Sequence, residues 1–120
     1  MEKMVGFALA LSCLLVSTPA RGQEQVSKEQ WIETMKTALP TVFCAEDQPF
    51  RTCFKVTQEE CENAAASATR ICLRKFQSKI PARLKQPEDG KKWGEQVGIC
   101  AGNTYAAALN AKKLKTKECQ

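Results

Sequence analysis

The spacing of apolar residues along the chain predicts three long helices. Over residues 28–39, apolar side chains recur every three or four positions, and Pro40 should end the helix because proline disfavours helical geometry in the residue before it. The same spacing runs over residues 58–79 and again over residues 91–115. No segment has the sustained two-residue alternation that is typical of strands. We therefore expect an all-α fold, a small disulfide-stabilised three-helix bundle.

Two similar phrases mark the starts of the first two helices. Ser27 is followed three residues later by Gln30, and Thr57 is followed in the same way by Glu60. In such a capping box, the hydroxyl of the first residue accepts a hydrogen bond from the helix backbone, and the later side chain bonds back to it. Both phrases therefore predict a helix N-terminus.

The first 22 residues have the features of a secretory signal. Lys3 precedes an apolar run over residues 7–16, and the small residues Ala20 and Gly22 stand where a signal peptidase reads the chain. We expect cleavage after Gly22, so that residues 1–22 are a signal peptide and residues 23–120 a single helical six-cysteine domain. The protein should then be exported, either to the periplasm or out of the cell.

A lipidated Cys13 is the alternative interpretation of this N-terminal segment. It is disfavoured because the apolar run would then continue beyond the cut. The run of about ten residues is also too short for a membrane span, which needs about 20. No later segment approaches that length, so we expect no transmembrane segment.

The expected mature segment holds an even number of cysteines. In an oxidising compartment this indicates disulfides, whereas a zinc site would use close C-x-x-C pairs that the sequence lacks. Three bonds would stabilise a small domain whose core is limited. The six expected disulfide cysteines are Cys44, Cys53, Cys61, Cys72, Cys100 and Cys119.

Helix geometry limits how these cysteines can pair. Cys61 and Cys72 would lie about 16 Å apart along one helix, beyond the roughly 7 Å limit for bonded α-carbons, so they cannot pair with each other. If the second and third helices are antiparallel, positions that sum to about 172 lie level, which favours Cys72 with Cys100. Two solutions remain for the other four: Cys53 with Cys119 and Cys44 with Cys61, or Cys61 with Cys119 and Cys44 with Cys53.

The composition offers little for catalysis. The chain has no histidine, the side chain most often used as a general base near neutral pH and the commonest metal ligand. Cysteines held in disulfides cannot act as nucleophiles, and no phosphate-binding glycine loop or cluster of metal ligands occurs. We therefore expect no enzymatic activity, no catalytic residues, no metal and no cofactor.

The net charge is +5, and the basic residues fall into two groups. They are either solvated surface or a surface for anions such as lipid headgroups, envelope polymers or an acidic protein. Nucleic acid is not expected as a partner of an exported chain. The first group is Arg70, Arg74, Lys75, Lys79, Arg83, Lys85, Lys91 and Lys92, and the second is Lys112, Lys113, Lys115 and Lys117.

Three glycines, Gly94, Gly98 and Gly102, lie beside the face of the third helix that should pack on the second. Each costs about 0.8–1 kcal/mol relative to alanine within a helix, so we expect a close contact that compensates. The contact is either the first helix, through Trp31 and Met35, or a partner, including a second copy of the chain in a homodimer. If the glycines instead break the helix, the segment is a loop.

The connection over residues 40–56 is long for a loop in a compact domain, so we expect the cysteines to order it. Three phenylalanines and three charged residues on it would form a surface for a partner. These candidate contact residues are Phe43, Glu46, Asp47, Phe50, Arg51 and Phe54.

By elimination, the leading hypothesis is a non-enzymatic exported helical protein that binds another protein in the periplasm or outside the cell. Inhibitors, immunity proteins and assembly factors act in this way. The alternative is a cationic secreted effector that acts on membranes or anionic envelope polymers. A carrier of small ligands is disfavoured, because alanine-rich helix faces pack closely and leave little room for an apolar cavity.

Overall fold

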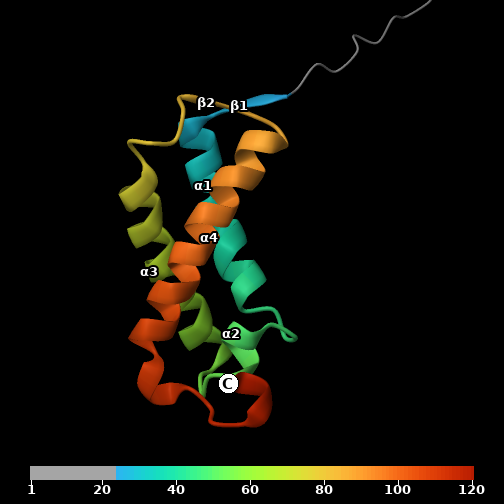
Figure 1. Ribbon diagram of the computed structural model, residues 1–120, viewed down its shortest axis with the longest axis vertical. Coiled ribbons are helices and arrows are strands. Elements are labelled where there is room, and N and C mark those ends of the chain that lie inside the picture. Colours follow the sequence, from blue (N-terminus) through green and yellow to red (C-terminus); the bar gives the residue numbers. More distant parts are fainter. Residues whose placement is uncertain (1–23) are drawn as a thin grey trace, which may run out of the picture.

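The computed structural model describes residues 24–120, which fold around three long helices that run in alternating directions (Figure 1). A single-turn helix lies between the first two of them, and two short 3-10 helices follow the last. The chain is thus mostly helical, as the apolar spacing predicts. The helices are α1 (Lys28–Phe43), α2 (Pro49–Thr52), α3 (Gln58–Phe76) and α4 (Glu88–Ala108), and the 3-10 helices are η1 (Asn110–Lys112) and η2 (Lys117–Cys119).

A two-stranded antiparallel sheet closes one end of the helices, so the prediction that the chain has no strands is wrong. β1 (Gln25–Ser27) precedes α1 and pairs with β2 (Arg83–Lys85), which lies between α3 and α4. Within the sheet, Val26 pairs with Leu84, whose side chain is fully buried. Each strand has three residues, too few for a two-residue alternation to be visible in the sequence.

Both capping phrases are confirmed as helix starts. Ser27 Oγ accepts a hydrogen bond from the Gln30 N–H at 3.1 Å. Thr57 Oγ1 accepts one from the Glu60 N–H, also at 3.1 Å. Each bond satisfies one of the N–H groups that the first turn of a helix leaves without an intrahelical partner. The N-termini of α1 and α3 are therefore fixed by local sequence.

The end of α1 differs from the prediction, because the helix passes Pro40 and continues to Phe43. Proline removes one intrahelical hydrogen bond at this point. The turn beyond it is held by the Cys44 N–H, which donates to the Pro40 carbonyl at 3.1 Å. Phe43, in that added turn, is buried in the core. Burial of the phenylalanine ring offsets the cost of the proline.

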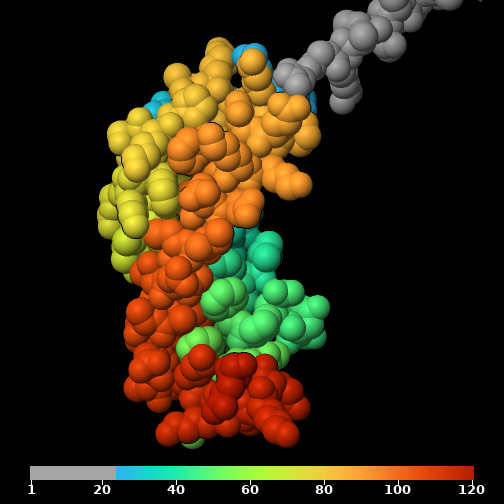
Figure 2. Space-filling view, in the orientation of Figure 1, coloured from blue at the N-terminus to red at the C-terminus, as the bar shows by residue number. Residues whose placement is uncertain are grey.

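α4 lies further toward the N-terminus than predicted. The Asp89 carboxylate accepts a hydrogen bond from the Lys85 N–H at 2.8 Å, which ties the first turn of α4 to β2. At the other end, the chain leaves the helix after Ala108, and the Leu114 N–H donates to the Cys53 carbonyl at 2.8 Å. The lysine-rich C-terminal segment therefore folds back instead of extending α4. Figure 2 shows this segment, in red, covering one end of the molecule.

Three disulfides connect the elements. Cys72–Cys100 joins α3 to α4, and this is the pair predicted from the level positions of two antiparallel helices. Of the two solutions that the sequence left open for the other four cysteines, the structure has Cys44–Cys61 and Cys53–Cys119. The first joins the end of α1 to α3, and the second joins the end of α2 to the C-terminal segment. The connection between α1 and α3 is thereby held to the rest of the protein.

Tyr105, the single tyrosine of the chain, is fully buried in the core. Its hydroxyl donates a hydrogen bond to the Phe50 carbonyl oxygen at 2.7 Å. The rings of Phe50 and Phe54 lie edge-on to it at centroid distances of 5.3 and 5.2 Å, and Phe43 lies at 6.5 Å. Edge-on aromatic pairs of this kind are favourable beyond the area they bury. Tyr105 therefore attaches α4 to the connection between α1 and α3.

The three glycines of α4 have different surroundings. A Cβ atom at Gly94 would lie 3.9 Å from Met35 Cε of α1, and one at Gly102 would lie 3.0 Å from the Phe50 ring. A Cβ atom at Gly98 would meet nothing within 4 Å. The helix is continuous through all three, which excludes the loop alternative. The protein's own α1 and α2 thus occupy this flank at Gly94 and Gly102.

Within residues 24–120, no helix is both long and apolar enough to cross a bilayer. The expected signal peptide of residues 1–22, including Cys13, lies outside the described residues.

The buried tyrosine should make stability depend on pH at the alkaline end. Burial raises the pKa of the Tyr105 hydroxyl, and the positive charge of Arg51 opposes this to a smaller extent. The stability that the protonated Tyr105 hydroxyl contributes is fully present below the pKa of the unfolded chain, about 10. It is lost as the pH rises through the higher pKa of the folded protein. Raising the pH above 10 should therefore lower the free energy of unfolding more in the natural protein than in Tyr105→Phe. Urea unfolding at several pH values measures both. Parallel losses in the two proteins would contradict this.

At pH 7 the same variant should be less stable. Tyr105→Phe removes the donor to the Phe50 carbonyl, so the free energy of unfolding should fall by about 1–3 kcal/mol. Equal stability at pH 7 would show that another donor replaces the hydroxyl.

Alanine substitutions should separate two of the glycines. Gly98→Ala should raise the free energy of unfolding by up to about 1 kcal/mol, because open space surrounds the position and alanine favours the helix. Gly102→Ala should raise the free energy of unfolding less, or lower it, because the added methyl group would displace the Phe50 ring. That ring is stacked on Phe43 at a centroid distance of 4.3 Å. Urea unfolding of both variants tests this. An equal gain at both positions would contradict it.

Candidate binding groove between α1 and α3

The apolar part of the contact surface predicted on the 40–56 connection lies in the core. Phe43 and Phe54 are each 7% exposed, and Phe50 is partly buried with its ring stacked on Phe43. The disulfides at Cys44 and Cys53 hold this segment against the helices, so its aromatic rings turn inward. These three rings are therefore not available as an exposed contact surface in the structure.

The charged residues of the same connection have different placements. Glu46 and Asp47 are exposed. Arg51 is partly buried, and it donates from Nε to Gln58 Oε1 at 2.9 Å and from Nη1 to the Val56 carbonyl at 3.0 Å. Arg51 thus links α2 to the start of α3. Glu46 and Arg51 line an open depression of about 890 Å³ whose wall includes Gln58.

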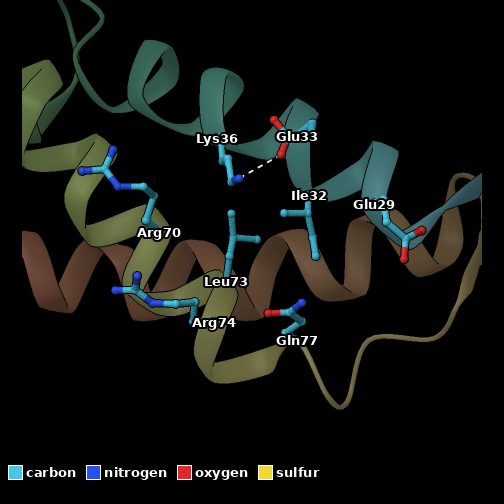
Figure 3. Close-up of a pocket in the computed structure, with 8 residues that line it drawn as sticks. All are labelled: Glu29, Ile32, Glu33, Lys36, Arg70, Leu73, Arg74 and Gln77. Carbon is cyan, nitrogen blue, oxygen red and sulfur yellow. Dashed lines mark hydrogen bonds and ion pairs between the residues drawn. The ribbon is translucent and has the colours of Figure 1, made fainter.

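A second hollow lies between α1 and α3, and we call it the α1–α3 groove (Figure 3). Its volume is about 290 Å³. Each wall of the groove has four residues with the same helical spacing, i, i+3, i+4 and i+7, which places each set along one helix face. The α1 residues are Glu29, Ile32, Glu33 and Lys36, and the opposite set is Arg70, Leu73 and Arg74 of α3 with Gln77, the C-cap residue of that helix.

The bottom of the groove is apolar. Leu73 is 2% exposed and Ile32 is partly buried, and their side chains point toward each other in Figure 3. The other six lining residues are polar or charged and exposed. α4 packs on both helices and runs behind them in this view, so the groove opens on the side away from α4. The arrangement is an apolar strip with charged margins.

The charges are unevenly distributed along the groove. Arg70 and Lys36 lie toward one end, and Glu29 and Gln77 lie toward the other, because α1 and α3 are antiparallel. Lys36 Nζ is ion-paired with Glu33 Oε1 at 2.8 Å. Within the described part of the chain, the side chains of Arg70, Arg74 and Glu29 make no hydrogen bond or ion pair. Two guanidinium groups with free donors therefore border one end of the groove, and in Figure 3 they extend away from Ile32 and Leu73.

Both ends of the groove are fastened. At the start of α1, Lys28 Nζ donates to the Gln77 carbonyl at 2.9 Å, and the Lys28 N–H donates to the Ala82 carbonyl at 2.9 Å. Beyond the other end, Cys44–Cys61 bonds α1 to α3. The two walls therefore keep a fixed separation, and the groove is preformed.

The sequence analysis did not predict this groove, although the sequence contains part of the pattern that forms it. Arg70 and Arg74 stood out only as members of a basic group, and Ile32 was not singled out. The matching rows of four positions on two helices are visible in the sequence once the helices are known to be neighbours. Among residues 24–120, no cluster of three or more histidine, cysteine, aspartate or glutamate side chains could hold a metal ion.

Comparison with known proteins adds a family. A family model described as T2SS substrate NttA, where T2SS denotes the type II secretion system, matches residues 25–113. No curated protein and no solved structure matches significantly. The matched range runs from β1 through η1, and so includes the groove and five of the six disulfide cysteines. The chain therefore belongs to the NttA family of type II secretion substrates and is an exported protein.

Proposed function

We propose that this protein is a non-enzymatic binding protein that, once exported, holds a protein partner in the α1–α3 groove. The observation that carries the proposal is the combination of a preformed apolar strip, Ile32 and Leu73, with the unpaired guanidinium groups of Arg70 and Arg74. Arginine beside buried apolar contacts is typical of the residues that dominate binding energy at protein interfaces.

The dimensions of the groove favour a protein over a small molecule. Pockets for small ligands usually enclose about 300–1,000 Å³ and bury most of the ligand. The groove holds about 290 Å³, and six of its eight lining residues are exposed. A small molecule would leave much of its surface in water. A protein would cover the groove with its own surface and exclude water from the apolar strip.

The side chains in the groove favour binding over catalysis. Glu33, one of its two carboxylates, is ion-paired with Lys36, and the other, Glu29, stands at the far end from Arg70. No nucleophile lies beside a base among the lining residues. Binding without chemistry is the simplest activity for this set.

A second candidate function is attraction to anionic membranes or polymers, favoured by one observation. The rings of Phe76 and Trp93 are paired at 6.2 Å at the adjoining ends of α3 and α4. Lys75 Nζ lies 5.7 Å from the Phe76 ring centroid, and Lys92 Nζ lies 5.3 Å from that of Trp93. Aromatic rings with lysines are typical of surfaces that bind anionic lipid headgroups.

Site-specific crosslinking tests the first proposal. A photoreactive residue would replace Lys36 or Gln77, which line the groove, or Ile99, an exposed residue of α4 outside it, as the matched control. After incubation of the oxidised protein with culture medium and cell-surface extracts, crosslinks to one protein should form from both groove positions and not from Ile99. Equal labelling from all three positions would contradict binding in the groove.

Vesicle binding tests the second candidate. Lys75→Ala with Lys92→Ala should abolish sedimentation with vesicles containing phosphatidylserine if the aromatic–lysine surface binds lipid, and leave the groove crosslinks unchanged. Sedimentation that is unaltered by these substitutions would exclude that surface as the lipid site.

A further inference from the structure

We infer that the α1–α3 groove accepts a short acidic helix of its partner, with one apolar side chain between Ile32 and Leu73 and carboxylates on Arg70 and Arg74. The inference rests on the proposed function, because it names the chemistry of the partner at the same groove.

The two arginines define the acidic character of the partner. Arg70 and Arg74 are four residues apart on α3, so their Cβ atoms lie about 5–6 Å from each other along one helix face. Each guanidinium carries a planar fork of donors that fits a carboxylate with two parallel hydrogen bonds. Within residues 24–120 neither group has a carboxylate partner. Two carboxylates at one-turn spacing would match both.

The apolar strip requires an anchor between those carboxylates. Leu73 lies between Arg70 and Arg74 in sequence and faces Ile32 across the groove (Figure 3). An inserted leucine or phenylalanine side chain would contact both, and the segment that carries it would cover the adjoining end of the groove, where the arginines lie. Ion pairs gain strength where water is excluded, so the anchor and the carboxylates reinforce each other.

The opposite end of the groove sets the direction of the partner segment. Glu29 is exposed there and has no cation partner among the described residues. It would repel a third carboxylate and attract a lysine or arginine. The segment should therefore carry its acidic residues toward the Arg70 end and a basic residue toward the Glu29 end.

The form of the groove favours a helix over an extended peptide. Its α1 row covers seven residue steps, or about 10.5 Å, which is about two turns of a facing helix. The groove runs along two antiparallel helices, and α4 already covers their other side. A helix laid in this position would complete a four-helix arrangement with α1, α3 and α4, and its side chains would enter a groove bordered by helical ridges.

Fluorescent helical peptides provide the probe. An alanine-based peptide of about 15 residues, long enough to form a helix, would carry two glutamates four residues apart, a leucine between them and a lysine one turn beyond. A second peptide replaces the glutamates with glutamines, and a third replaces them with lysines. Fluorescence anisotropy with the oxidised protein at about 0.15 M salt, where distant charges are screened, gives the dissociation constants.

Charge reversal in the groove is the decisive comparison. The natural protein should bind the glutamate peptide about tenfold more tightly than the glutamine peptide. Arg70→Glu combined with Arg74→Glu should lose this preference and bind the lysine peptide best. The matched control, Lys115→Glu combined with Lys117→Glu, makes the same change in net charge at exposed residues outside the groove and should keep the preference for glutamate.

Three outcomes would overturn the inference: equal affinity for the glutamate and glutamine peptides, equal loss of binding in the control, or no gain for the lysine peptide after charge reversal. Gain of a new ligand also shows that the reversed variant is folded. If the peptides fail these tests but crosslinks still form from the groove positions, the acidic helix is excluded and the proposal that the groove binds a protein remains. If no crosslinks form from the groove positions but the protein still prefers the glutamate peptide, the proposed protein partner is excluded and the preference of the groove for acidic helices remains.

Discussion

α1 and α3 are fastened to each other at both ends, by Cys44–Cys61 at one and by Lys28 at the other, and the remaining elements are arranged around this pair. The buried side of α3 carries small residues such as Ala65 and Ala68, so neighbouring helices can approach closely. Cys72–Cys100 then attaches α4 to α3. Because the pair cannot separate or rotate freely, the rows of side chains on its outer side keep a constant relation, and a groove can persist without a ligand.

Features of the fold that depend on neighbouring residues in the sequence were predictable, and features that depend on contacts between distant segments were not. The hydroxyls of Ser27 and Thr57 act within one helical turn, so their effect is legible in a short window of sequence. The relation between Cys72 and Cys100 also followed from helix rise alone, once two helices were taken as antiparallel. β1 and β2, in contrast, pair only because the connection after α3 returns to the start of α1.

The candidate site shows the same division. The phenylalanines of residues 43–54 have the composition of a binding loop, but they pack around Tyr105 in a segment held by disulfides. Their spacing in the sequence does not show which way the rings face. Arg70 and Arg74 are surface residues by any helical projection. Their place beside a groove becomes visible only when Ile32 is placed opposite Leu73, which depends on the rotation of α1 about its own axis. Tertiary packing decides that rotation, and no short stretch of sequence records it.

The disulfide between Cys53 and Cys119 has a consequence for the order of assembly. Its two cysteines are 66 residues apart, and both α3 and α4 lie between them. This bond can close only after every long helix has been synthesised and has reached an oxidising compartment. A chain that stops before Cys119 keeps a thiol at Cys53, which can attack a disulfide of another molecule and form a mixed disulfide while one thiol of that molecule is released. The oxidation state of Cys53 therefore depends on the presence of a residue that follows α3 and α4 in the chain.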